Sequence, residues 1–127
     1  MPENILSLTR DEVVQRVREA LRWHRGETKK IARWELVEQV YGHGATLDRT
    51  NNNPYDRVVR EVISEYRDID LIVSTTQDGG GYWLAESIKE AEIIAADYVK
   101  RSRVMELKAR NVRKRAVETF GPQIPLL

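Results

Sequence analysis

The sequence predicts an α+β fold in which three short helices and a two-stranded hairpin precede one long helix. Three observations support this prediction. Apolar residues recur at three- and four-residue spacing in three segments upstream of residue 67. Two short apolar runs then flank a turn that ends in three consecutive glycines. Finally, no proline or glycine occurs between Ser87 and Gly121, which leaves room for a helix of many turns.

Composition is that of a folded domain with a helical appendage. Of the 127 residues, 41% are hydrophobic and 32% are charged, which suits a modest core under a charged surface. We expect an N-terminal extension (1–8), a domain (9–85), a long helix (86–120) and a tail (121–127). The absence of cysteine excludes disulfides and thiolate metal sites. With no apolar run long enough to span a membrane and no signal-peptide layout, we expect a cytoplasmic protein.

The first helix is predicted to begin at the Thr-x-x-Glu capping box of Thr9 and Glu12 and to end near Gly26. Its expected buried face consists of Val13, Val14, Val17, Ala20 and Leu21. Residues 29–31 are predicted to form a short strand. A second helix is expected over residues 33–41, with Gly42 as its stop.

The third helix is predicted over residues 54–66, after a long asparagine-rich loop (43–53). Asn53 is a favourable N-cap, and Pro54 suits the first helical position, where its missing N–H costs nothing. The expected buried stripe is Val58, Val59, Val62, Ile63 and Tyr66. The opposite, solvent-facing side is expected to carry Asp56, Arg57, Arg60, Glu61 and Ser64.

A hairpin is predicted from residues 71–75 and 81–85, joined by a turn whose glycines supply the positive φ angles it needs. By the period-two rule, Tyr82 and Leu84 point to one face of this hairpin and Trp83 to the other. Since one face must cover the helices, we expect Trp83 to be left for a partner.

The long helix is predicted over residues 88–120, opened by a capping box of Ser87 and Glu90. Its 33 residues would measure about 50 Å at about 1.5 Å per residue. A heptad seam of mostly small residues runs along it: Ile88, Ala91, Ala95, Tyr98, Ser102, Met105, Ala109, Val112, Ala116 and Thr119. The seam predicts self-association as a homodimer, in parallel or antiparallel pairing, or a helix folded back on itself.

Charge is divided unevenly along the chain. Residues 1–85 hold 12 Lys and Arg against 14 Asp and Glu (net −2), and residues 86–127 hold 9 against 6 (net +3). Eight cations fall between residues 100 and 115, opposed by Glu106 alone, and could neutralise a nucleic-acid backbone. They could equally flank an oligomer seam. An antiparallel dimer, in which Glu90 and Glu92 meet residues 113–115, is slightly favoured, and the two roles are compatible.

Helix, turn, helix and then a glycine-tipped hairpin is the outline of a winged-helix domain. Residues 60–67 (REVISEYR), 72–74 (IVS) and 80–84 (GGYWL) resemble the N-terminal winged helix of the biotin protein ligase repressor and small winged-helix proteins of phages and prophages. The resemblance covers residues 27–85. It implies that the helix over 54–66 enters the major groove of DNA, with Tyr55, Arg57 and Arg60 reading bases. The long loop, Asp56, Glu61 and the lack of a ligase domain depart from that family.

Two kinds of function follow. The first is a sequence-selective DNA-binding homodimer, a transcriptional regulator or replication accessory factor of a phage or mobile element. Its candidate nucleic-acid contacts are Arg49, Asn52, Asn53, Tyr55, Arg57, Arg60, Thr76, Gln77, Lys100, Arg101, Arg103 and Lys108. The second is a non-enzymatic interaction module that docks through Trp83 and Trp34. We expect no enzyme and no cofactor, because two histidines without ligand spacing and no activated nucleophile offer no catalytic site.

Each candidate contact also has a purely structural interpretation. Arg57 and Arg60 would then form an ordinary solvated helix face with i,i+4 neighbours. Asn53 is expected mainly as a helix cap. Thr76 and Gln77 would be turn residues only, next to an Asp78 whose charge repels phosphate.

Overall fold

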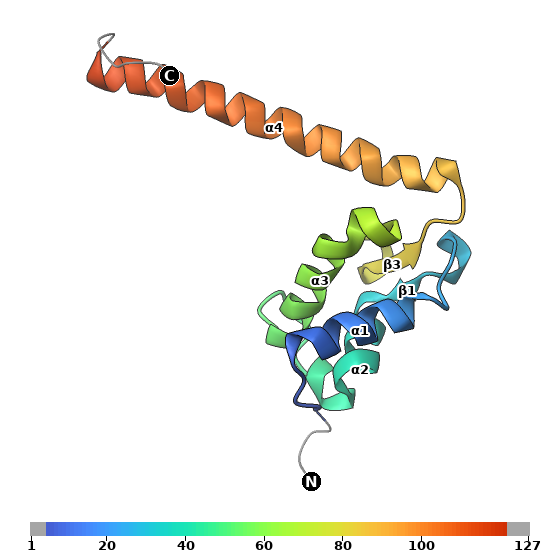
Figure 1. Ribbon diagram of the computed structural model, residues 1–127. Helices are drawn as coiled ribbons and strands as arrows, with labels where there is room; N and C mark the ends of the chain where they lie inside the picture. The colour runs from blue at the N-terminus through green and yellow to red at the C-terminus, as the bar shows by residue number, and fades with distance from the viewer. Residues whose placement is uncertain (1–4, 122–127) are drawn as a thin grey trace. The chain divides into compact units, whose positions relative to one another are not determined.

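The computed structural model describes residues 5–121, and over this range the α+β class is confirmed (Figure 1). The elements in chain order are α1 (Arg10–Leu21), η1 (Glu27–Lys29), β1 (Ile31–Ala32), α2 (Arg33–Tyr41), η2 (His43–Thr46), α3 (Pro54–Asp70), β2 (Ile72–Thr75), η3 (Gln77–Gly79), β3 (Gly81–Leu84) and α4 (Ile88–Phe120). The η elements are single 3₁₀ turns. The chain divides into two compact units, Met1–Ile94 and Ala95–Leu127, which are described separately.

The core of the first unit lies between α1, α2, α3 and one face of a small sheet. The buried residues of this core are Val13, Val17, Leu21, Ile31, Leu36, Val37, Val40, Tyr41, Ala45, Val59, Val62, Ile63, Ile72 and Tyr82. The predicted capping box opens α1, since Thr9 Oγ1 accepts from the Glu12 N–H (3.2 Å) and the Thr9 N–H donates to Glu12 Oε1 (2.9 Å). The stripes predicted for the first and third helices lie in or against this core, which also includes residues from outside the helices, such as Ile31, Ile72 and Tyr82.

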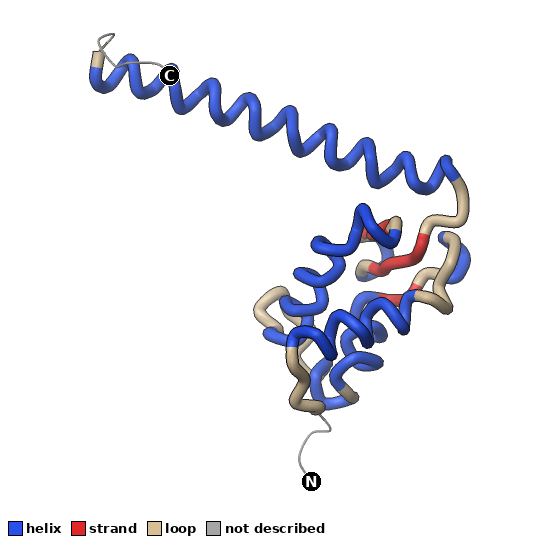
Figure 2. The backbone as a smooth tube through the Cα atoms, viewed as in Figure 1, coloured by secondary structure: helices blue, strands red, loops and turns tan. Residues whose placement is uncertain are grey.

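The sheet is antiparallel, with strand order β1-β3-β2, and its strands are short (Figure 2). Residues 29–31 were expected as the first strand, but Lys29 lies in η1 and the strand is Ile31–Ala32. Ile31 pairs with Tyr82 and Ala32 with Gly81. Glycine is required at position 81 because a Cβ there would lie 2.8 Å from the Ile31 carbonyl oxygen. Any side chain at position 81 would therefore collide with the backbone of β1.

Helix α3 is one turn longer than the prediction of residues 54–66. It continues to Asp70 and ends at Leu71, which adopts the left-handed conformation (φ 59°). The prediction that Asp56 faces solvent is wrong, because its side chain is fully buried. Two arginine side chains take the place of water around its carboxylate, as described below.

The outer face of the hairpin is covered, and the prediction of an exposed Trp83 is therefore wrong. Trp83 is only 4% exposed and forms a second cluster with Val73, Ala85 and Ile94, against which Ala91 packs. The first two turns of α4 thus lie on the sheet face opposite the helical core. They belong to the compact unit that ends at Ile94, beyond the expected boundary at residue 85.

Helix α4 spans Ile88–Phe120, as predicted from the capping box and the following glycine. In the second unit, every described residue from Ala95 to Phe120 except Asp97 and Ala116 is solvent-exposed. No helix among residues 5–121 combines the length and apolar character needed to cross a membrane. Between Ala95 and Phe120, α4 is therefore a largely exposed helix that carries both charged and apolar side chains.

Candidate nucleic-acid interface

Helix α3 presents Arg57, Arg60 and Ser64 on its solvent-exposed side. Tyr55, predicted to read bases beside them, is half-buried, and its ring packs on Tyr41 with centroids 4.9 Å apart. The Tyr55 ring therefore packs against the core of the domain and does not lie on the exposed face of α3. Among the three side chains that the family resemblance proposed for base contacts, the two arginines are the ones on the open face.

The Arg60 guanidinium is held along one edge and open at the other. Its Nε donates to Asp56 Oδ2 (2.8 Å), and its Nη2 donates to the Asn51 carbonyl oxygen (3.1 Å). The Nη1 end makes no hydrogen bond to any residue in the described range, and the side chain is 42% exposed. A guanidinium has five N–H donors in a rigid plane, so the Nη1–Nη2 end can still donate two hydrogen bonds outward.

The carboxylate that holds Arg60 belongs to Asp56, which is fully buried and serves two arginines. Arg33 Nε donates to Asp56 Oδ1 (2.9 Å), and Arg33 Nη2 donates to both Asp56 Oδ2 and Asn51 Oδ1. The Asp56 hydrogen bonds raise the pKa of Arg33 above its ordinary value. We call Arg33, Asn51, Asp56 and Arg60 the arginine clamp.

The arginine clamp joins segments that are distant in the sequence. Arg33 opens α2, and its guanidinium stacks over the Trp34 ring at 4.6 Å. Its backbone N–H donates to the Gly80 carbonyl at the base of the hairpin turn (3.2 Å). Arg33 and Asn51 were not among the predicted site residues. The i,i+4 spacing of Asp56 and Arg60 indicates that these two side chains can pair on one helix, but no residue near Arg33 in the sequence indicates that Asp56 is its partner.

Asn53 is a buried cap whose side chain has no room for a ligand. Its Oδ1 accepts from the N–H groups of Tyr55 (2.8 Å) and Asp56 (3.0 Å), and its Nδ2 donates to the carbonyls of Ala45 and Asp48. At 2% exposure, it cannot also reach nucleic acid as predicted. Its four hydrogen bonds instead fix the loop before α3.

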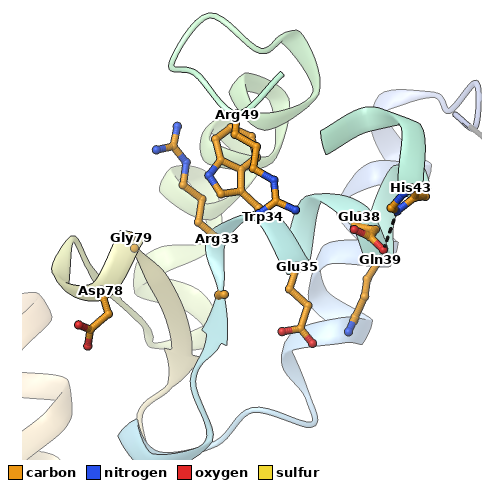
Figure 3. A pocket seen from close by; sticks show the side chains of 11 residues that line it. Arg33, Trp34, Glu35, Glu38, Gln39, His43, Arg49, Asp78 and Gly79 are labelled. Atoms are coloured by element: carbon orange, nitrogen blue, oxygen red, sulfur yellow. Dashed lines mark ion pairs between the residues drawn. The ribbon is translucent and has the colours of Figure 1, made fainter. Parts of the chain in front are cut away.

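The loop and the hairpin turn border an open groove of about 670 Å³ at the start of α2 (Figure 3). Its lining residues are Ala32, Arg33, Trp34, Glu35, Glu38, Gln39, His43, Arg49, Asp78, Gly79 and Gly80. Arg49 donates to the Thr46 carbonyl (3.2 Å), and His43 lies 3.3 Å from Glu38. Charges of both signs line this groove, so it does not by itself favour an anion.

The remaining predicted contacts of the first unit are all exposed. Asn52 lies in the turn before α3. Thr76 and Gln77 lie in the hairpin turn, where the Gln77 N–H donates to Thr75 Oγ1 (3.1 Å). Asp78, expected to repel phosphate, lies 3.8 Å from Lys30 Nζ, so part of its charge is compensated.

Acidic residues of α3 are turned toward arginines of α1. Arg10 pairs with both Glu61 (3.0 Å) and Glu65 (3.1 Å), and Arg18 pairs with Asp70 (2.7 Å). Arg57, in contrast, forms no side-chain hydrogen bond or ion pair within residues 5–121. The open face of α3 is therefore more positive than the net charge of the domain suggests.

Along the second unit, the predicted cations Lys100, Arg101, Arg103 and Lys108 are all solvent-exposed. Arg101 Nη2 pairs with Asp97 within the helix (3.0 Å). The larger seam residues Tyr98, Met105 and Val112 are 39%, 70% and 67% exposed.

The first residues of the predicted seam differ in their contacts from those beyond Ala95. Ala91 is half-buried against the hairpin cluster, whereas Ile88 is 89% exposed. Glu90 accepts from Trp83 Nε1 (3.1 Å) and from the N–H groups of Glu86 (3.1 Å) and Glu27 (3.2 Å). Three donors within the chain thus share the Glu90 carboxylate, and its predicted contact with the cations of an antiparallel partner stays a prediction.

No protein-family model, curated protein or solved structure matches this chain. The resemblance to the biotin protein ligase repressor and to phage winged-helix proteins therefore stays a prediction. Within residues 5–121, no group of three or more His, Cys, Asp or Glu side chains is arranged to hold a metal ion.

Proposed function

We propose that this chain is a sequence-selective DNA-binding protein with a winged-helix domain, which acts as a homodimer in phage or mobile-element transcription or replication. The observation that carries the proposal is the state of Arg60. Its guanidinium is held from behind by a fully buried carboxylate, while its outer end stays open on an exposed helix face.

The order of elements supports the winged-helix assignment. Three helices are followed by a hairpin, and the short β1 joins this hairpin to complete an antiparallel sheet. In such a domain α3 would be the recognition helix, and the η3 turn would be the wing that approaches the phosphate backbone.

The chemistry of Arg60 suits guanine. The O6 and N7 atoms of guanine are two acceptors on the major-groove edge, and an arginine end that donates two hydrogen bonds matches them. Because Asp56 and Asn51 already restrict the guanidinium, less conformational entropy is lost on binding than for a free arginine. Arg57, one turn earlier and unpaired among the described residues, could reach a neighbouring base or phosphate.

Affinity would come largely from α4. From Ala95 to Phe120 the helix holds eight Lys and Arg against three Asp and Glu, a net charge of +5. Neutralised phosphates release counterions, so binding through such a segment falls steeply as salt is raised. In this proposal the α3 arginines supply selectivity and the α4 cations supply much of the affinity.

The test is a selection of binding sites from a random duplex library, followed by anisotropy titrations of selected and unrelated duplexes at two salt concentrations. Arg60→Ala should weaken the selected site at least about tenfold, since a bidentate base contact is worth about 1–3 kcal/mol. The unrelated duplex should be affected much less. Arg60→Lys should behave like Arg60→Ala, because lysine keeps the charge but lacks the fork.

Arg16→Ala is the matched control, because it removes an exposed cation from α1 and leaves α3 intact. Equal losses for Arg16→Ala and Arg60→Ala would contradict base readout by Arg60. If the protein binds no duplex at low salt, the proposed function itself is wrong.

A protein-docking role is the second candidate, favoured by one observation. Trp23 is 78% exposed at the end of α1, and Arg22 and Arg25 lie on either side of it in the sequence. Trp83, the anchor expected for such a role, is buried, and Trp34 is stacked under Arg33. Trp23 would then be the anchor. Absence of duplex binding, together with loss of a partner on Trp23→Ala, would select this function.

A further inference from the structure

The seam of α4 beyond Ala95 alternates small and larger residues. In heptad notation its a positions are small, and its d positions are larger and apolar except at the last repeat. The a residues are Ala95, Ser102, Ala109 and Ala116, and the d residues are Tyr98, Met105, Val112 and Thr119. Met105 and Val112 are 70% and 67% exposed, so this part of the seam has room for another helix.

The alternation favours one orientation of a second copy. In an antiparallel pair, a positions face d positions, so every layer joins a small residue to a larger one. With Met105 opposite Ala109 of the partner subunit, Tyr98 meets Ala116 and Ser102 meets Val112 of that subunit. A parallel pair would instead alternate Tyr–Tyr and Met–Met layers with Ala–Ala and Ser–Ser layers. Interiors pack at uniform density, so the antiparallel layers fit better.

Antiparallel pairing also brings positively charged side chains of the two helices close together. The positions immediately before a, which flank the seam, are Arg101, Lys108 and Arg115. In an antiparallel pair these flanks lie side by side, and six cations from two chains then form one row. We call this row the basic stripe. Like charges this close oppose pairing until salt or a bound anion screens them.

We propose that two copies of α4 pair antiparallel along this seam, and that a nucleic-acid backbone on the basic stripe stabilises the pair. This inference rests on the proposed DNA-binding function. Duplex DNA carries one charge per about 1.7 Å of axis, which provides ample phosphate for a row of cations of this spacing. Dimerisation and DNA binding would then strengthen each other, because the dimer assembles the row of cations that binds DNA, and bound DNA screens the repulsion that opposes the dimer.

Cysteine cross-linking tests the orientation, because the chain has no cysteine of its own. Full-length Met105→Cys and Ala109→Cys chains, one of them tagged, are mixed with a short duplex and oxidised. The antiparallel pair should give mainly the mixed cross-link. Cross-links of each variant with itself would show parallel pairing and overturn the proposed orientation.

Sedimentation equilibrium tests the role of the charges. Without DNA, the dimer should tighten about tenfold as NaCl rises from about 0.05 M to about 0.5 M, because screening weakens the repulsion. Adding a short duplex at the lower salt should have the same effect. A dimer that loosens with salt in the absence of DNA would show that attractive ion pairs hold it, contrary to the basic stripe.

Two matched triple variants test whether the repulsion comes from the basic stripe rather than from cations elsewhere on α4. The triple change Arg101→Gln, Lys108→Gln and Arg115→Gln should tighten the DNA-free dimer and remove its salt response. The triple change Arg103→Gln, Arg110→Gln and Lys114→Gln removes as many cations from other faces and should leave the dimer nearly unchanged. Equal effects of the two triples would refute a defined stripe.

A second pair of variants tests whether the apolar seam holds the dimer together. Val112→Asp should abolish the dimer, whereas Leu107→Asp, an exposed apolar residue on the opposite face, should not. A full-length monomer under every condition overturns the seam pairing even where the duplex still binds. If the dimer tightens with salt but the protein binds no duplex, the proposed function is wrong, and so is the proposal that DNA stabilises the pair. Antiparallel pairing along the seam would still stand. Binding to anionic vesicles instead of duplex would assign the stripe to a membrane surface.

Discussion

Replacing Asp56 with alanine removes the carboxylate on which the arginine clamp depends. In the folded protein this group is fully buried and accepts hydrogen bonds from both Arg33 and Arg60. Without it, two guanidinium groups face each other across a small cavity with no anion between them. The prediction is a large loss of stability and, separately, a loss of DNA selectivity.

The magnitude follows from the exposure of the three groups. Removing one partner of a buried ion pair costs about 3–5 kcal/mol when the other charge is stranded away from water. Arg33 and Arg60 are 21% and 42% exposed, so both can partly recover hydration by turning outward. We therefore expect Asp56→Ala to cost about 3 kcal/mol, at the low end of that range. Asp56→Asn should cost less, because the amide still offers one acceptor.

Urea unfolding followed by circular dichroism and by tryptophan fluorescence measures this loss. For a domain of this size, about 3 kcal/mol corresponds to a shift of about 2 M in the urea midpoint. Asp68→Ala is the control, because it removes an exposed carboxylate from the same helix and should change stability by less than about 0.5 kcal/mol. A loss of under about 1 kcal/mol for Asp56→Ala, or one no larger than the control, would refute the clamp as a stabilising unit.

Two further predictions concern Glu90 near the start of α4 and the capping box of α1. Glu90→Ala should cost about 1–3 kcal/mol, because it leaves Trp83 Nε1 and the backbone N–H groups of Glu27 and Glu86 without an acceptor, and it should change the Trp83 fluorescence. The exposed Glu92→Ala should do neither. Hydrogen bonds from Thr9 lower the pKa of Glu12 below its ordinary 4.5, so its stabilising effect should be present above that pH and disappear as pH falls through the lowered value. Comparison of wild type with Glu12→Gln by thermal unfolding at pH 7 and in acid tests this, and an unchanged difference would contradict it.

Much of the fold follows from local sequence signals. A capping box marks the start of α1, Ser87 Oγ accepts from the Glu90 N–H at the start of α4, Asn53 caps α3, and the glycines at 79–81 mark the hairpin turn. Each signal involves residues within four positions of one another, so no knowledge of tertiary structure is needed to interpret it. The helical stripes also predicted the core, because an exposed apolar stripe would be costly.

The features that could not be predicted depend on distant segments. Asp56 looks like a surface residue on a helical wheel, and only the approach of Arg33 from α2 makes its burial possible. The burial of Trp83 likewise depends on Ile94, which the chain brings back over the outer face of the hairpin. Period-two alternation separates the two faces of a hairpin, but it does not say how many of them will be covered.

Pairing, more than net charge, determines what the α3 surface offers to a ligand. Residues 1–85 carry a net charge of −2, but most acidic groups of α3 are paired with arginines. Glu61, Glu65 and Asp70 face arginines of α1, and Asp56 is buried under the clamp. A buried carboxylate with two arginines contributes a net positive charge to the surface above it, and its effect on a ligand decays within a Debye length of about 10 Å. The acidic residue that seemed to disqualify this helix thus orients the arginine that would read DNA.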